Sequence, residues 1–265
     1  SEVGEYLSSH PEVDMVSFTG STSAGVRVSQ AAAPSVKRVT LELGGKSANV
    51  ILDDADIVRA AKSSVGACFA NSGQTCSALT RLIIPENKKD EILEIITSRV
   101  AGFNAGDPLD ETTRCGPMAS ARQQSSVSDF IVSGISEGAT LLAGGEGMPD
   151  GLETGYFVKP TAFADVTPDM TIWNEEVFGP LLTVTTYSSE EEALSLANDS
   201  EYGLSGGVWS ENEERALAFA KKMRTGQVSI NGGPFNISAP FGGYKMSGNG
   251  RELGLHGLQE FLELK

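Results

Sequence analysis

The sequence predicts an α/β fold built around a largely parallel sheet. Short apolar runs that are typical of strands alternate with segments in which apolar residues recur at helical spacing. Turns that contain glycine, serine or proline separate the two kinds of segment, as in chains built from repeated strand–helix units. The 265 residues are enough to bury a large core without disulfides or structural metal ions, and they allow one or two domains.

The first third of the chain opens with a strand–turn–helix pattern. The apolar run at 13–18 ends in a Gly/Ser/Thr turn and precedes an alanine-rich segment, so we expect a buried strand almost at the start of the chain. Strands are also expected at 39–43 and 48–52, with two glycines between them. A helix follows, with one apolar face formed by Ile57, Ala61, Val65 and Phe69.

The rest of the chain continues this alternation. A polar break at 71–75 ends the helix and leads to a strand at 79–84 and a helix at 86–99. Further strands are expected at 181–187, 206–209 and 227–231. Further helices are expected at 189–198 and 212–223, and the glycine-rich stretches 144–151 and 242–250 are expected to be loops.

The charge of the chain excludes some classes of partner. The net charge of −15 comes from 20 basic and 35 acidic residues, which argues against binding to nucleic acid or to an anionic membrane. An anionic cofactor remains possible, because a helix N-terminus binds phosphate locally whatever the global charge. No apolar stretch is long enough to span a bilayer, and no signal peptide is visible.

The cysteines and histidines exclude most metal chemistry. Cys68, Cys76 and Cys115 are odd in number and lack C-x-x-C spacing, which argues against a disulfide framework and a zinc ribbon. A reducing compartment, the cytoplasm, is therefore expected. With only His10 and His256 present, we expect neither a multi-histidine metal site nor a Ser–His pair. The chain starts at Ser1 without Met and ends inside an apparent amphipathic run, so we expect a fragment of a longer protein.

Cys76 is the candidate nucleophile. It follows a polar, glycine-bearing junction between a helix and a strand, where a thiol can reach a cleft beside unused backbone N–H groups. A nucleophilic cysteine needs an electropositive, partly exposed setting. The alternative is a small buried hydrophobic residue, which is how we interpret Cys68, whereas Cys115 is interpreted as a loop thiol.

Glu42 is the candidate general base. It lies between Leu41 and Leu43 inside a predicted strand, where burial raises the pKa of a carboxyl group and so suits it to accept a proton. The alternative is an acid on the exposed surface of an edge strand.

Five motifs in order carry a resemblance to a known family. They are FTGST (18–22), LELGGK (41–46), FANSGQTC (69–76), EEVFGP (175–180) and PFGGYKMSG (240–248). The series, which spans nearly the whole chain, resembles the aldehyde dehydrogenase superfamily. The resemblance implies a three-layer α/β/α catalytic domain at 47–246, preceded by the end of a cofactor-binding domain at 1–46. Residues 247–265 would return toward the cofactor domain.

The resemblance also implies roles for individual residues. Cys76 would attack an aldehyde to give a thiohemiacetal, hydride would pass to NAD or NADP, and Glu42 would activate the water that hydrolyses the resulting thioester. Glu252 would relay protons, although an exposed acid at a helix start is the alternative. The residues implied to hold the cofactor are Gly20, Ser21, Thr22 and Gly25 at the pyrophosphate, Glu176 at the nicotinamide ribose and Phe178 beside the ring.

Other consequences concern the whole protein. The resemblance implies a small-molecule aldehyde as substrate and a homodimer or homotetramer as the parent assembly. Because the first part of the cofactor domain is missing, we expect little NAD-dependent turnover from this chain alone. Two alternatives remain open: a cofactor-independent thiol esterase that uses Cys76 and Glu42, and a structural relative without catalysis.

Overall fold

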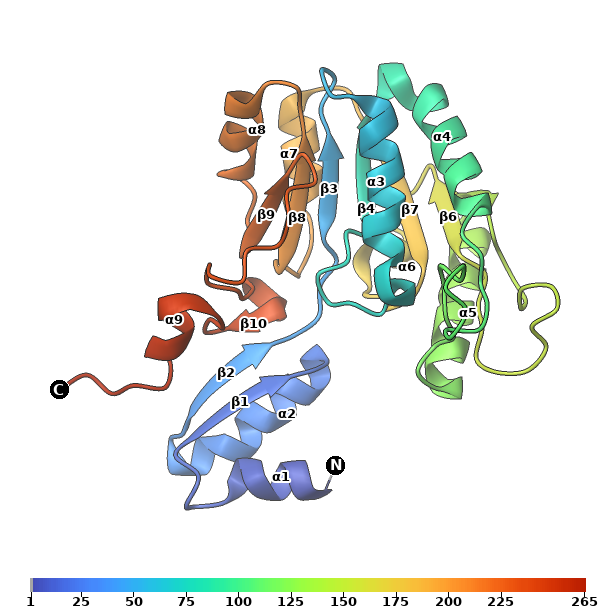
Figure 1. The fold of residues 1–265 in the computed structure, drawn as a ribbon. Helices are drawn as coiled ribbons and strands as arrows, with labels where there is room; N and C mark the ends of the chain where they lie inside the picture. The colour runs from blue at the N-terminus through green and yellow to red at the C-terminus, as the bar shows by residue number, and fades with distance from the viewer. Residues whose placement is uncertain (1) are drawn as a thin grey trace.

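The computed structural model describes residues 2–265 and places the strands in two sheets (Figure 1). The smaller sheet has the order β1 (Met15–Thr19), β2 (Arg38–Glu42) and β10 (Gly248–Asn249). Helices α1 (Glu2–Ser9) and α2 (Thr22–Ala32) accompany this sheet, and α9 (Gly254–Gln259) follows β10. β1 pairs with β2 in parallel, whereas the returning β10 pairs with β2 in the antiparallel direction.

The larger sheet has seven strands in the order β5-β6-β7-β4-β3-β8-β9. Only β5 is antiparallel to its neighbour, so the prediction of a largely parallel α/β sheet is confirmed. The strands are β3 (Ala48–Ile51), β4 (Arg81–Pro85), β5 (Thr140–Ala143), β6 (Thr161–Ala164), β7 (Leu181–Tyr187), β8 (Ser205–Trp209) and β9 (Gln227–Ile230).

Helices cover both faces of the larger sheet, which gives three layers (Figure 1). Alternate residues of one strand enter different cores: in β4, Ile83 joins one cluster, whereas Leu82 and Ile84 join the other. α3 (Ile57–Phe69) and α4 (Lys89–Ala101) pack on the Leu82 side. The other cluster takes residues from α5 (Ala121–Ser136), α6 (Thr171–Asn174), α7 (Glu190–Asn198) and α8 (Glu213–Ala220).

Several sequence-based expectations were wrong. An unpredicted helix, α1, precedes the first strand, and β1 is only half-buried because it lies at the edge of its sheet. The expected loop at 242–250 contains a short 3₁₀ turn (Lys245–Ser247) and β10. Cys115 lies in a loop, as expected, and is buried at 1% exposure. Within residues 2–265, no helix combines the length and apolar composition needed to cross a bilayer.

Candidate active site

Cys76 lies on the connection between α3 and β4, directly after a left-handed turn. Asn71, Ser72 and Gly73 have φ angles of 51°, 56° and 71°. Such angles are unusual for residues other than glycine and cluster at functional sites, where the surrounding structure holds them. Gly73 also has no room for a side chain, because a Cβ there would lie 2.1 Å from the Gly179 carbonyl oxygen. The nucleophile loop therefore packs directly on the 176–180 loop.

The charges around Cys76 differ from the expected electropositive setting. Burial raises the pKa of this half-buried thiol, and the nearby Glu176 and Glu42 carboxylates raise it further. The backbone N–H groups of Ser77 and Cys76 itself act in the opposite direction. The two acidic side chains that act on the thiol therefore oppose the electropositive setting that activates a cysteine. The thiol is partly accessible, and Glu42 is close enough to act on it electrostatically.

Glu42 ends β2, the central strand of the smaller sheet. It is 5% exposed, so the alternative of a surface acid on an edge strand was wrong. Burial and the charge of Glu252 raise its pKa to about 8, against the lowering effect of Arg251. Within residues 2–265, neither carboxylate oxygen has a hydrogen-bond partner. A buried, unpaired carboxyl with a raised pKa suits a group that must take up and release a proton.

Two glycines, Gly44 and Gly45, follow Glu42 and lie directly against Glu176 and Cys76. A Cβ at Gly44 would lie 2.0 Å from Glu176 Oε2, and one at Gly45 would lie 2.6 Å from the Cys76 carbonyl oxygen. The Gly45 N–H donates to Glu176 Oε1 at 3.0 Å. The link between β2 and β3 is therefore packed between Glu176 and the Cys76 backbone, which places the candidate base Glu42, the candidate nucleophile Cys76 and Glu176 around one short segment.

Glu252 lies close to Glu42 but not at an exposed helix start. Its backbone forms a bridge with Phe241, with both N–H···O distances at 2.7 Å. The residue is half-buried, and α9 begins two residues later. Its charge is the second largest cause of the raised pKa of Glu42, which places the two carboxylates near each other.

The residues expected at the cofactor separate into two groups. Ser21, Thr22 and Glu176 line one groove of about 660 Å³ at the start of α2. Ser21 caps this helix, accepting a hydrogen bond from the Ala24 N–H, and Thr22 donates to the Met246 carbonyl at 3.2 Å. A groove at a helix start, lined by hydroxyls, suits a phosphate group.

The other predicted cofactor residues do not line that groove. Gly25 is buried, and a Cβ there would lie 2.7 Å from the Leu43 side chain, so it allows α2 to pack closely on the sheet. The Gly20 N–H donates to the Glu42 carbonyl at 3.1 Å. Phe178 is 37% exposed, with a φ angle of 52°.

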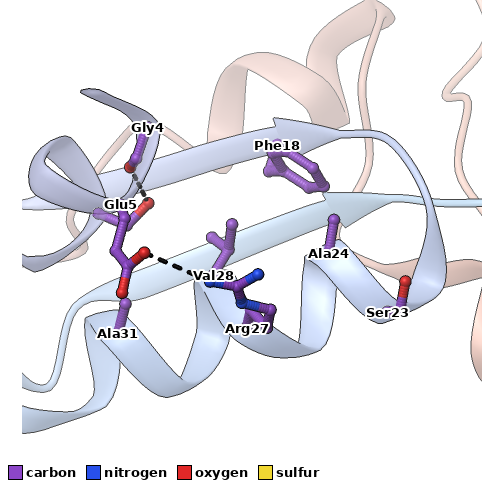
Figure 2. Close-up of a pocket in the computed structure, with 9 residues that line it drawn as sticks. Gly4, Glu5, Phe18, Ser23, Ala24, Arg27, Val28 and Ala31 are labelled. Carbon is purple, nitrogen blue, oxygen red and sulfur yellow. Dashed lines mark hydrogen bonds and ion pairs between the residues drawn. The ribbon is translucent and has the colours of Figure 1, made fainter. Parts of the chain in front are cut away.

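A second groove of about 280 Å³ lies between α1, β1 and α2 (Figure 2). It shares Ser23 and Arg27 with the first groove, so the two adjoin along α2. Phe18 lines it from β1, and an exposed ion pair of 3.3 Å between Arg27 and Glu5 joins α2 to α1 beside it. This groove could not be expected from the sequence, because α1 was not predicted.

Two charged residues near the site were also missed. Lys46 is 2% exposed, its ammonium has no hydrogen-bond partner within residues 2–265, and burial lowers its pKa to about 7. Arg251 donates to the Gly243 and Gly250 carbonyls and is the cation that acts on Glu42. Lys46 ends the motif at 41–46 and Arg251 follows the motif at 240–248, but nothing in the sequence indicated that their side chains turn inward.

Across the described chain, no group of three or more His, Cys, Asp or Glu side chains could hold a metal ion.

Comparisons with known proteins find relatives along the whole chain. A family model described as "Aldehyde dehydrogenase family" matches residues 1–265. The chain is 54% identical over 263 residues to a 3-succinoylsemialdehyde-pyridine dehydrogenase from a Pseudomonas species, covering 99% of this chain and 55% of that protein. It is 46% identical to a putative aldehyde dehydrogenase from Staphylococcus haemolyticus, with the same two coverages.

Solved structures give the same result. A mutant of aldehyde dehydrogenase C from Pseudomonas syringae, complexed with NAD+ and octanal, matches with a TM-score of 0.98 and 47% identity, covering 99% of this chain and 54% of that one. The Mycobacterium tuberculosis aldehyde dehydrogenase complexed with NAD+ matches with a TM-score of 0.97 and 44% identity, covering 100% and 55%. The chain therefore spans about half the length of the relatives that it matches.

Proposed function

We propose, since this chain belongs to the aldehyde dehydrogenase family, that it carries the nucleophile and the general base of an NAD+-dependent aldehyde oxidation. The observation that supports this most directly is the proximity of Cys76 to Glu42. The Glu42 carboxylate acts electrostatically on the half-buried thiol, and Gly45, three residues after Glu42, lies directly against the Cys76 backbone.

The proposed reaction has two covalent stages. The Cys76 thiolate attacks the aldehyde carbon, and the backbone N–H of Cys76 donates to the oxygen that becomes negative in the thiohemiacetal. Loss of hydride from that carbon leaves a thioester on Cys76. Glu42 then takes a proton from water as the water attacks the thioester, which releases a carboxylic acid and restores the thiol. Glu252 is proposed to pass the proton from Glu42 outward.

NAD+ is the proposed cofactor, and it would supply the hydride acceptor. Ser21 and Thr22 would hold its diphosphate at the start of α2, and Glu176 would bind the ribose next to the nicotinamide. The adjoining groove between α1 and α2 is lined in part by the aromatic ring of Phe18 (Figure 2). It would suit the flat adenine base at the other end of NAD+. The acids around Cys76 favour a positively charged ring beside the sulfur, where it would lower the pKa of the thiol.

The domain boundaries and the behaviour of the chain alone are also proposals. We propose a cofactor domain that ends near residue 46, a catalytic domain at 47–246 and a return segment at 247–265, supported by the pairing of β10 with β2. Cytoplasmic location and assembly of the full-length protein into a homodimer or homotetramer are proposed with it.

We expect the 265-residue chain by itself to produce little NADH, because it spans only about half the length of the relatives that it matches. Steady-state NADH production by the purified chain, measured beside a full-length relative with the same aldehydes, tests this. NADH production by the chain at the rate of the relative would contradict the expected impairment. Absence of aldehyde oxidation from a full-length protein that contains this chain would contradict the function itself.

The raised pKa of Glu42 predicts how the reaction depends on pH. With a pKa of about 8, Glu42 is mostly protonated at neutral pH, and only its carboxylate can accept a proton from water. We therefore expect kcat to rise from about pH 7 to about pH 9 when thioester hydrolysis limits the rate. The measurement is kcat against pH. Since Glu252 helps to raise the pKa of Glu42, Glu252→Gln should shift the rise to lower pH. A flat profile for the wild type would contradict the assignment.

A further inference from the structure

Two side chains of the nucleophile loop are bonded to the segment at 116–119, which precedes α5. Ser72 Oγ accepts from the Gly116 N–H at 2.8 Å and donates to the Gly116 carbonyl at 3.1 Å. Gln74 Nε2 donates to the Pro117 carbonyl at 3.4 Å, and Gln74 Oε1 accepts from the Ala119 N–H at 2.8 Å. Four hydrogen bonds therefore join the turn before Cys76 to one short piece of backbone.

The turn requires this support because its backbone is unfavourable by itself. Asn71 and Ser72 are held at positive φ, where side chains other than glycine crowd the backbone. Within the turn, Asn71 and Gln74 exchange two hydrogen bonds of 3.0 Å. On its other side, the turn meets the 176–180 loop through the close approach of Gly73 to Gly179 and Pro180.

The segment at 116–119 is itself fixed to the core. The Met118 side chain is 2% exposed, and its N–H donates to the Tyr156 carbonyl at 2.8 Å. Ser120 then caps α5 by accepting from the Gln123 N–H at 3.2 Å. If the hydrogen bonds between the turn and this segment are lost, we therefore expect the turn to move while residues 116–119 stay in place.

We propose that Ser72 and Gln74 are positioning residues for the nucleophile, an inference that rests on the proposed role of Cys76. They hold the turn so that the sulfur stays against the backbone N–H groups of Cys76 and Ser77. Those N–H groups oppose the effect of burial and of the two acids on the thiol. If the turn relaxes, the sulfur loses this support, fewer thiolates form at neutral pH, and attack on any electrophile slows.

The test compares two glutamines that make similar bonds. Gln74→Met keeps the length of the side chain and removes both hydrogen bonds to 116–119. Gln124→Met is the matched control, because half-buried Gln124 donates to the Phe157 carbonyl at 2.9 Å but does not contact the turn. The readout is the rate at which iodoacetamide alkylates Cys76, followed by peptide mass spectrometry across a range of pH.

We expect Gln74→Met to slow alkylation of Cys76 at pH 7 by roughly 10-fold and to shift the pH profile upward. Gln124→Met should leave the rate and the profile unchanged. If Gln74 had a merely structural role, Gln74→Met would lower thermal stability without moving the pH profile of alkylation. In the full-length protein, Gln74→Met should lower kcat while leaving KM for NAD+ unchanged.

A second variant keeps the test decisive if Gln74→Met does not fold. Ser72→Gly removes both bonds to Gly116 and suits the positive φ, so the backbone itself is not strained. It should slow alkylation in the same direction. Wild-type alkylation profiles in the folded variants would overturn the proposal. Failure of the proposed function has a different signature, because aldehyde oxidation would then survive in Cys76→Ala whatever the alkylation rates are.

Discussion

Replacement of Cys76 with alanine is expected to lower kcat for aldehyde oxidation by at least about 10⁴-fold in the full-length protein. The physical reason is that the thiol forms the covalent bond on which both stages depend. Without it, hydride would have to leave an aldehyde hydrate that nothing in the site holds covalently. Residual rate would come only from the groups that bind the substrate and polarise its oxygen.

The measurement is NADH formation with saturating aldehyde and NAD+, together with release of p-nitrophenol from an activated ester. Both signals should disappear in Cys76→Ala, and ester cleavage should not depend on NAD+ in the wild type. The matched control is Cys68→Ala, because Cys68 is fully buried in α3 and donates to the Leu181 carbonyl at 3.4 Å. Burial raises the pKa of the Cys68 thiol to about 12, so its loss should not affect turnover in protein that remains folded.

Substantial NADH formation by Cys76→Ala would contradict the proposed mechanism. Loss of activity in both alanine variants would require a check of folding by circular dichroism before any conclusion about chemistry. If only Cys68→Ala were inactive while folded, the nucleophile would have to be reassigned. The half-buried position of Cys76, compared with the sealed position of Cys68, is the structural reason to expect the opposite.

The parts of the fold that the sequence predicts well are those with a strong local pattern. The strand predicted at 181–187 coincides with β7, and the helix with apolar residues every fourth position coincides with α3 (Ile57–Phe69). In α3 the buried residues recur at helical spacing, and in β7 the first four residues are all buried, as expected for a strand inside a covered sheet.

Other elements were missed because their local pattern is weak. α5 contains five serines and two glutamines among its 16 residues, and only Val127, Ile131 and Gly134 are buried. β5 and β6 have four residues each, and β5 is largely exposed. Strands this short are stabilised by their neighbours in the sheet rather than by their own sequence, so no window of the sequence indicates them.

The candidate site shows the same division. Cys76 and Glu42 could be singled out because each residue type is unusual in its local context, a thiol at a polar junction and a carboxyl inside an apolar strand. The residues that surround them could not be predicted. Glu176 and Arg251 act on the site from positions more than about 130 residues after Glu42 in the chain, and no local pattern reports contacts over that separation. The acidic side chains that act on the Cys76 thiol could not be identified from the sequence for this reason.

Replacement of Glu42 with glutamine is expected to separate the two stages of the reaction. Glutamine fills nearly the same space but cannot accept a proton from water. Thiohemiacetal formation and hydride loss should therefore continue, whereas hydrolysis of the thioester should slow by roughly 10²–10⁴-fold. In a full-length protein with saturating NAD+, we expect one rapid burst of NADH per active site followed by very slow turnover. The acylated protein should accumulate.

Intact-protein mass spectrometry measures that accumulation directly, since the mass should rise by that of the acyl group and fall again on treatment with hydroxylamine. Glu252→Gln is the comparison, because it removes the neighbouring acid and leaves Glu42 in place. It should slow hydrolysis less than Glu42→Gln does, because Glu42 can still take the proton from water, so less acylated protein should accumulate. Steady turnover of Glu42→Gln at the wild-type rate would assign water activation to another group. Loss of the burst would place Glu42 in the first stage, where its charge beside Cys76 acts on the thiol itself. The acid would then influence catalysis through the ionisation of the nucleophile rather than through water.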